Sequence, residues 1–330
     1  MATISQIAAE AKVSRALVSR VLNNKPGVSP ANRKKIQAII AKHNYIPNAI
    51  ARSLVTQKTR TIGVVMDSLC DAYFFDLISG MQNRAEELDY NIIFCSGAND
   101  SGIKSKYVDY FVGGRSDGLI AFGSRFHDLF HKIIKQAKHF VIIEGDIPNM
   151  SFNKVQVNNF KGSYQATKHL IDLGYKDIVH FTGDMDYSVS EERLNGFTKA
   201  MVDHQFSLKN AIIYSDFGED TAYQKMKELI RNGQLPQACF AGADKPAYGI
   251  LRALNEAGLK APDDMALIGF DYDHPTSRNI IFPQLTTFKQ PLYEMGKAAV
   301  TLLINSIDNP EAPVETIIFD AEFVKGETCD

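Results

Sequence analysis

The sequence lacks any run of eighteen apolar residues, so no segment is expected to span a membrane. It also lacks a basic start followed by an apolar run, so we expect no signal peptide and a cytoplasmic protein. Cysteine is scarce, and the four residues are scattered without metal-ligand spacing, at Cys70, Cys95, Cys239 and Cys329. In a cytoplasmic chain they are expected to be reduced, small, buried apolar side chains.

Sequence motifs of several enzyme classes are also missing. The chain has no Walker A, GxGxxG, GxSxG or HExxH pattern. His127 and His131 lie four residues apart on an expected helix, but no third metal ligand is evident nearby. We therefore predict a protein that is not an enzyme and that holds neither a cofactor nor a metal.

What the sequence does have is a strong separation of charge. Its 330 residues are 45% hydrophobic and 22% charged, which is ordinary for two or three domains. Residues 1–60 contain eleven Lys or Arg and one acid, a net charge of +10, whereas the remainder contains 25 basic and 37 acidic residues, a net charge of −12. A basic segment on an acidic body indicates nucleic-acid binding and weighs against a small helical bundle without such a role.

The basic segment has the pattern of three short helices. Apolar residues recur at helical spacing over 4–11, over 14–23 and over about 30–43. Ser14 can cap the second helix, whose apolar face is expected at Val18, Val21 and Leu22. This arrangement predicts a helix-turn-helix, whose second helix enters the DNA major groove.

Two segments carry a family resemblance. The run Ser19-Arg20-Val21-Leu22-Asn23 and the stretch from Tyr45 to Leu54 resemble the headpiece of the LacI/GalR family of bacterial repressors. The resemblance implies a hinge helix that enters the minor groove of DNA, with Leu54 wedged between base steps. Lys12 departs from the pattern, since the family usually has glycine there, and its φ would be positive. The expected DNA-binding residues are Thr3, Ser14, Arg15, Ala16, Ser19, Arg20, Asn23, Asn48, Ala51 and Leu54.

After residue 60 the pattern changes to alternating strands and helices, which predicts an α/β fold with parallel sheets. The alternation runs twice, so we expect two α/β halves of similar plan, resembling the periplasmic-binding-protein-like core of the same family. The expected chain crossings lie near 158–160, 287–290 and 310–314. The predicted domains are a headpiece (1–46), a hinge helix and linker (47–60), an N-terminal subdomain (61–158 and 290–312) and a C-terminal subdomain (159–288 and 313–330).

Ligands of open α/β sheets bind beyond the carboxyl ends of the strands, so we expect the binding cleft between the two halves. Carboxylates, an arginine and aromatic residues follow the predicted strands, and they suit the hydroxyl groups and apolar faces of a sugar. Motif position relative to the family supports Arg193, Phe217 and Asp271. One of Phe74 and Phe75 is expected to face the cleft while the other packs inward. The expected effector-binding residues are Asp67, Phe74, Phe75, Glu144, Arg193, Phe217, Asp244, Asp271 and Gln290.

The resemblance implies a homodimer that binds a pseudo-palindromic double-stranded DNA operator and is released by a small sugar, a mono- or disaccharide. Lys245 adds positive charge near the expected cleft, so a phosphorylated or acidic effector remains an alternative to a neutral sugar. Two alternatives also remain. One is a regulator of the same fold with a purine, sugar phosphate or protein as corepressor. The other is a transport-type sugar-binding protein, against which the basic headpiece counts.

Overall fold

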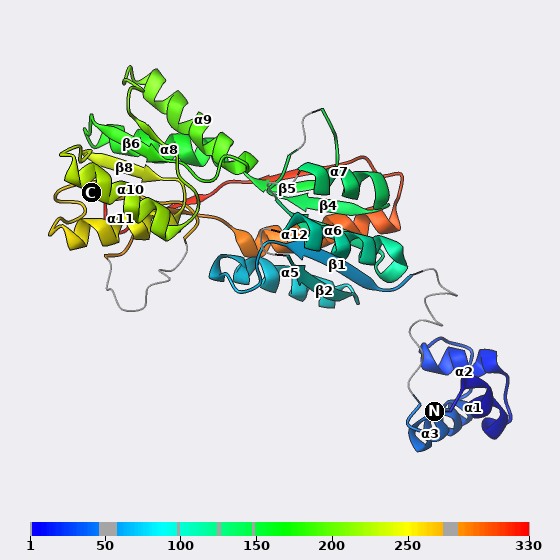
Figure 1. The fold of residues 1–330 in the computed structure, drawn as a ribbon. Helices are drawn as coiled ribbons and strands as arrows, with labels where there is room; N and C mark the ends of the chain where they lie inside the picture. Colours follow the sequence, from blue (N-terminus) through cyan, green and yellow to red (C-terminus); the bar gives the residue numbers. More distant parts are fainter. Residues whose placement is uncertain are drawn as a thin grey trace. The chain divides into compact units, whose positions relative to one another are not determined.

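The computed structural model describes residues 2–45, 58–97, 100–123, 127–146, 149–272 and 283–329. The chain divides into two compact units, Met1–Thr59 and Arg60–Asp330 (Figure 1). None of the described helices combines the length and apolar character needed to cross a membrane.

The first unit contains the three predicted helices, α1 (Ile4–Ala11), α2 (Arg15–Leu22) and α3 (Pro30–Lys42). They enclose a small apolar core of Ile7, Ala8, Ala11, Val18, Val21 and Ile36. The turn between α1 and α2 passes through Lys12 in the left-handed conformation, with φ of 57°, as the sequence predicted. The helix-turn-helix prediction is therefore confirmed.

The second unit begins with a six-stranded parallel sheet, which with its helices we call the first lobe. Its order is β11-β5-β4-β3-β1-β2. The strands are β1 (Thr61–Met66), β2 (Asn91–Ser96), β3 (Gly118–Phe122), β4 (Phe140–Ile143), β5 (Lys154–Val157) and β11 (Thr316–Phe319). The helices are η1 (Ala72–Phe74), α5 (Phe75–Glu87), α6 (Ser101–Tyr110), the π-helical η2 (Phe111–Arg115), α7 (His127–Gln136) and α12 (Leu292–Asp308).

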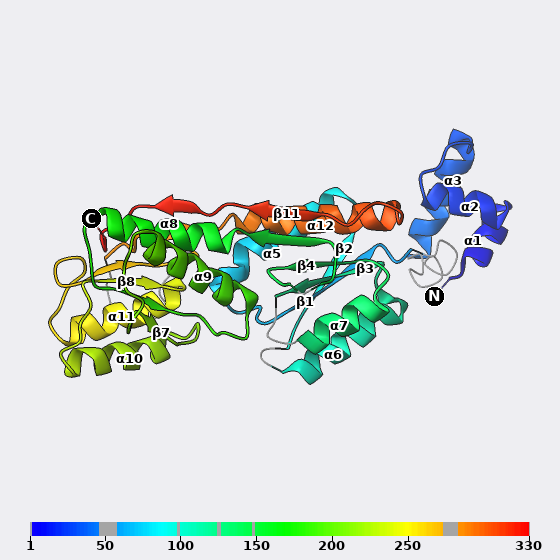
Figure 2. The same ribbon diagram turned by 90° about the horizontal axis from the view of Figure 1, so that it is seen from above.

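Helices cover both faces of this sheet (Figure 2). Side chains alternate along β1, so Ile62 and Val64 pack with the core on the α5 and α12 side, whereas Val65 packs with α6 and α7. Burial on both faces explains why β1 and β3 read as short continuous apolar runs rather than as alternating patterns.

The second lobe repeats the plan around a four-stranded parallel sheet with the order β7-β6-β8-β9. Its strands are β6 (Ile178–Phe181), β7 (Ile212–Ile213), β8 (Ala238–Ala241) and β9 (Ala266–Ile268), and its helices are α8 (Asn159–Asp172), α9 (Ser188–Asp203), α10 (Glu219–Arg231) and α11 (Asp244–Glu256). The short antiparallel pair of β10 (Thr287–Lys289) and β12 (Glu322–Val324) accompanies it. The predicted fold class is confirmed: a helical headpiece is followed along the chain by an α/β core of two halves with parallel sheets.

The last chain crossing differs from the prediction. We expected the chain to enter the second lobe near 310–314, but β11 pairs in parallel with β5, from Thr316 beside Lys154 to Phe319 beside Val157. The crossing therefore follows Phe319, and assigning residues 313–319 to the second lobe was wrong. Strand β5 was not predicted because it is only four residues long, which is too short for its alternating pattern to stand out from the surrounding loop.

Candidate functional site

The exposed face of α2 is the first candidate site. Ser14 caps the helix, since its hydroxyl accepts the backbone N–H of Leu17 at 3.2 Å. Val18 and Val21 turn into the headpiece core, so Arg15, Ala16 and Arg20 are exposed on the opposite side. The helix therefore presents two guanidinium groups to solvent beside small side chains, which permit a close approach to DNA.

The acidic side chain of the headpiece, Glu10, is paired with basic groups on another helix end. Glu10 forms ion pairs with Lys42 at 2.7 Å and with His43 at 2.5 Å, at the end of α3. Thr3 forms a capping box with Gln6 at the start of α1. The Asn23 side chain donates to the backbone oxygen of Ser19 at 2.8 Å. The other predicted DNA contacts, Asn48, Ala51 and Leu54, lie outside the described residues.

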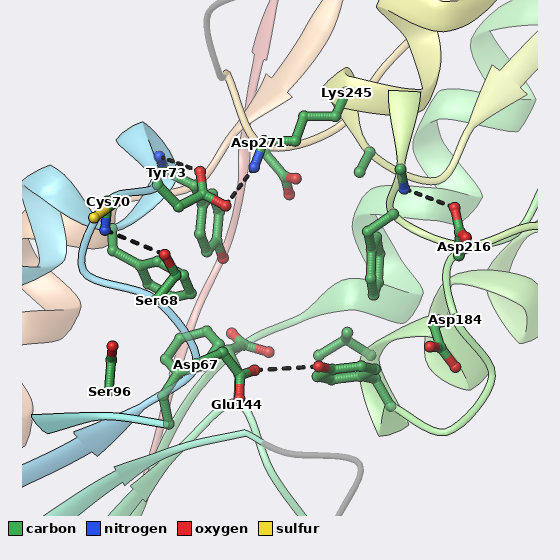
Figure 3. A pocket seen from close by; sticks show the side chains of 18 of the residues that line it. Asp67, Ser68, Cys70, Tyr73, Ser96, Glu144, Asp184, Asp216, Lys245 and Asp271 are labelled. Carbon is green, nitrogen blue, oxygen red and sulfur yellow. Dashed lines mark hydrogen bonds and ion pairs between the residues drawn. The ribbon is translucent and has the colours of Figure 1, made fainter. Parts of the chain in front are cut away.

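The second candidate site is a cavity of about 720 Å³ between the two lobes (Figure 3). It lies at the carboxyl ends of strands from both sheets, where the sequence placed the cleft. Six carboxylates and two cations line it: Asp67, Asp71, Glu144, Asp184, Asp216, Asp271, Arg193 and Lys245. Its size is in the usual range for small-ligand sites.

Six of the nine predicted effector residues line this cavity, namely Asp67, Phe74, Glu144, Arg193, Phe217 and Asp271. Phe75 does not. Its side chain is 55% exposed at the start of α5, so the expectation that the second phenylalanine packs inward was wrong. Asp244 is buried behind the cavity wall, where its carboxylate accepts the Thr287 hydroxyl at 2.6 Å. Gln290 is buried too, and it contacts the cavity wall through a neighbouring residue, Asp271.

That neighbour belongs to a buried network around Arg193, which is 4% exposed. The guanidinium donates to Asn159 Oδ1 at 2.9 Å and to the backbone oxygen of Gly242 at 2.5 Å, and it pairs with Asp271 Oδ1 at 3.3 Å. Gln290 donates to the same Asp271 oxygen at 2.6 Å. Because these contacts fix the orientation of both charged groups, the pair is preorganised at the cavity wall.

Glu144 is the second buried carboxylate. Its two oxygens accept the backbone N–H of Val157 at 2.6 Å and the Asn159 amide at 3.0 Å. Burial raises the pKa of Glu144 to about 7, although these two hydrogen bonds and nearby Arg193 act in the opposite direction. The network therefore contains a carboxyl group whose protonation changes near neutral pH.

The backbone is unusual at two carboxylates of the cavity wall, Glu144 and Asp271. Glu144, directly after β4, has φ of 52°, and Asp271, three residues after the end of β9, has φ of 114°. Gly123 packs against the first of these, since a Cβ on it would lie 1.6 Å from the Glu144 backbone oxygen. Non-glycine residues adopt such conformations at an energetic cost, and they cluster at binding sites.

Aromatic rings supply the apolar part of the wall. On the first lobe Phe74 packs edge to face with Tyr73 and with Phe122, at centroid distances of 5.0 and 4.9 Å. On the second lobe Tyr187 meets Phe217 at 5.6 Å and an interplanar angle of 79°. The cavity thus has flat apolar surfaces on both sides and polar groups between them.

Sequence reasoning did not select several lining residues. Tyr73, Tyr187 and Lys245 follow predicted strands, but no motif separated them from their neighbours. Phe122 was not predicted either, although it is the last residue of β3 and therefore lies at the carboxyl edge of the sheet. Cys70 lies exposed at the cavity, in contrast to the buried Cys239 and Cys329, so the expectation of four buried cysteines was wrong.

Comparison with known proteins identifies the family of the two regions that contain these candidate sites. Residues 3–48 match the family described as bacterial regulatory proteins, lacI family, and residues 167–329 match the periplasmic binding protein-like domain. The chain is 31% identical over 328 residues to the HTH-type transcriptional repressor PurR of Actinobacillus pleuropneumoniae serotype 3, and the match covers 98% of this chain and 97% of that one. The chain belongs to the LacI family.

A second LacI-family relative is the ribose operon repressor of Haemophilus influenzae, which is 30% identical, with 99% of this chain and 98% of the relative covered. Among solved structures, the lac repressor dimer bound to operator and the anti-inducer ONPF has the same fold, with a TM-score of 0.89 at 24% identity over 99% of this chain and 98% of that one. This LacI-family protein is therefore a DNA-binding transcriptional regulator with a ligand-binding core, and its named relatives are transcriptional repressors.

Proposed function

We propose that this regulator binds a pseudo-palindromic operator as a homodimer and that a small neutral sugar in the cleft, of one or two rings, releases it. The observation that carries the proposal is the preorganised pair of Arg193 and Asp271 at the wall of a cavity with aromatic sides. Charged groups of this kind form strong hydrogen bonds to hydroxyls, and the rings cover the apolar faces of a sugar.

The charges of the cavity favour a neutral ligand over an anionic one. Carboxylates outnumber cations six to two among the lining residues. Both cations also have protein partners, because Arg193 pairs with Asp271 and Lys245 pairs with Asp71. A phosphorylated sugar would have to break these pairs and would meet repulsion from the remaining carboxylates.

A flat heteroaromatic base, such as a purine acting as corepressor, is the second candidate. The observation that favours it is the presence of aromatic rings on both lobes, Tyr73 and Phe74 on one side and Phe217 on the other. A planar ring stacked between them would use the same polar wall.

For the headpiece, we propose that Arg15, Ala16, Ser19 and Arg20 contact base edges in the major groove, and that Thr3, Ser14 and Asn23 contact the DNA beside them. The support is the exposure of Arg15, Ala16 and Arg20 on α2, together with the pairing of the Glu10 carboxylate with Lys42 at the end of α3.

The proposed domain plan keeps the headpiece at 1–46 and the hinge and linker at 47–60. We propose that Asn48, Ala51 and Leu54 of the hinge contact the minor groove.

A thermal-shift panel tests the effector. Pentoses, hexoses, disaccharides, sugar phosphates and purines are added to the wild type, to Asp271→Asn and to the control Asp203→Asn, which alters an exposed carboxylate paired with Lys199 on α9. We expect a neutral sugar to raise the Tm of the wild type and the control alike and to leave Asp271→Asn unchanged. A response only to purines would replace the sugar with the second candidate. A response only to phosphorylated sugars would contradict the charge argument.

A further inference from the structure

The loop that follows β1 receives two contacts from the opposite lobe (Figure 3). The Lys245 ammonium at the start of α11 forms an ion pair with Asp71. The Tyr187 hydroxyl at the start of α9 donates to Asp67 Oδ2 at 3.2 Å. Both acceptors belong to the first lobe and both donors to the second, so each contact spans the cleft. We call these two pairs the cross-cleft contacts.

The acceptor Asp71 is held in place by its own lobe. One of its carboxylate oxygens accepts the backbone N–H of Tyr73 at 3.2 Å, which caps the short helix η1. The other oxygen receives Lys245. Because the cap fixes the carboxylate, the ion pair forms with little loss of side-chain freedom in Asp71.

The acceptor Asp67 is likewise held by its own lobe. Its second oxygen pairs with the ammonium of Lys104, a lysine on α6 that is only 1% exposed. The stem of Lys104 passes over Gly97, where a Cβ would lie 2.6 Å from the Lys104 Cγ. This buried cation holds one oxygen of the Asp67 carboxylate, and the other oxygen accepts the Tyr187 hydroxyl at the cleft.

The cross-cleft contacts join protein groups only, so their formation requires no atom of an effector. The Lys245–Asp71 pair is partly shielded, since the two side chains are 25% and 24% exposed. The Tyr187 ring is supported by Phe217 at 5.6 Å. These are the features of contacts that keep measurable strength in water, unlike mobile surface pairs.

We propose that the cross-cleft contacts draw the two lobes together before any effector binds, so that the closed cleft is an intrinsic state of the core and effector entry requires the contacts to open. The loop that they hold continues β1, and β1 begins at Thr61, directly after the linker from the headpiece. The contacts therefore set how the second lobe is placed relative to the strand that leads to the DNA-binding unit. Only the consequence for effector entry rests on the proposed function of the cleft.

Small-angle X-ray scattering of the full chain, without added ligand, tests this proposal. We expect Lys245→Ala and Tyr187→Phe each to raise the radius of gyration, because a larger share of the molecules has an open cleft. Loss of one shielded polar contact should raise the ratio of open to closed molecules about fivefold. Lys227→Ala is the matched control, because its ion pair with Glu256 at 3.2 Å joins two helices of one lobe.

Salt provides a second measurement on the same samples. Screening should raise the radius of gyration of the wild type but not of Lys245→Ala. The proposal is overturned if all variants scatter alike, or if Lys227→Ala expands the protein as much as Lys245→Ala. Failure of every sugar to bind would overturn the proposed function without altering the scattering result, so the two failures can be told apart.

Discussion

Replacing Glu144 with glutamine gives a quantitative test of the buried network behind the cleft. The carboxyl group is 6% exposed, and burial raises its pKa from 4.5 to about 7. The folded protein therefore holds a proton on Glu144 between these two pH values, whereas the unfolded chain has already released it. Stability contributed by this proton is present at low pH and is lost as the pH rises towards 7.

The size of the effect follows from the shift. When the pH rises from about 5 to about 7.5, a carboxyl group with these two pKa values lowers the free energy of unfolding by about 2 kcal/mol. Glu144→Gln cannot titrate, so its free energy of unfolding should lack this component. The difference between wild type and variant should thus change by about 2 kcal/mol across the range, and the wild type should lose the more stability on going to the higher pH.

Urea denaturation at the two pH values measures the difference. Glu228→Gln is the control, because Glu228 is exposed on α10 and its replacement should leave the pH dependence of the wild type unchanged. If wild type and Glu144→Gln respond to pH in parallel, or if the wild type gains stability relative to the variant as the pH rises, the reasoning about this carboxyl group is refuted.

Three further predictions concern DNA binding and assembly. Arg15→Ala or Arg20→Ala should cost about 1–3 kcal/mol of operator affinity and relax preference at one base pair per half-site, while Lys35→Ala weakens all sequences alike; equal weakening in competition assays would mark the arginines as phosphate contacts. Leu54→Ala should weaken operator binding without changing effector affinity in calorimetry, and a parallel loss of both would contradict a wedge in the groove. Light scattering at micromolar concentration should show a dimer, and a monomer would count against the proposed assembly.

The sequence predicted the headpiece and the alternation of the core because both rest on local patterns. Helical spacing, the Ser14 cap and short apolar runs act within a few residues of one another, and the three headpiece helices were predicted to within about two residues at their ends. The position of β11 could not be read in this way, because its assignment depends on pairing with β5, more than 150 residues earlier.

The site was predictable only in outline for a related reason. Position after a strand identified the correct edge of each sheet, and motif position selected Arg193 and Asp271 correctly as cavity residues. It could not show which way a side chain turns. Asp244 turns towards Thr287 and away from the cavity, whereas Lys245, the next residue, reaches across it to Asp71. Such choices depend on tertiary contacts that a single sequence does not contain.

Titration of a labelled operator complex with neutral sugars, followed by fluorescence anisotropy, tests whether a ligand of the cleft controls DNA binding. For the wild type and for Asp203→Asn, we expect the sugar identified by thermal shift to change operator occupancy with the same midpoint. For Asp271→Asn, we expect normal operator binding and no response to the sugar, because the polar partner in the cleft is lost. A wild-type midpoint in Asp271→Asn would show that the effector does not act through this cleft.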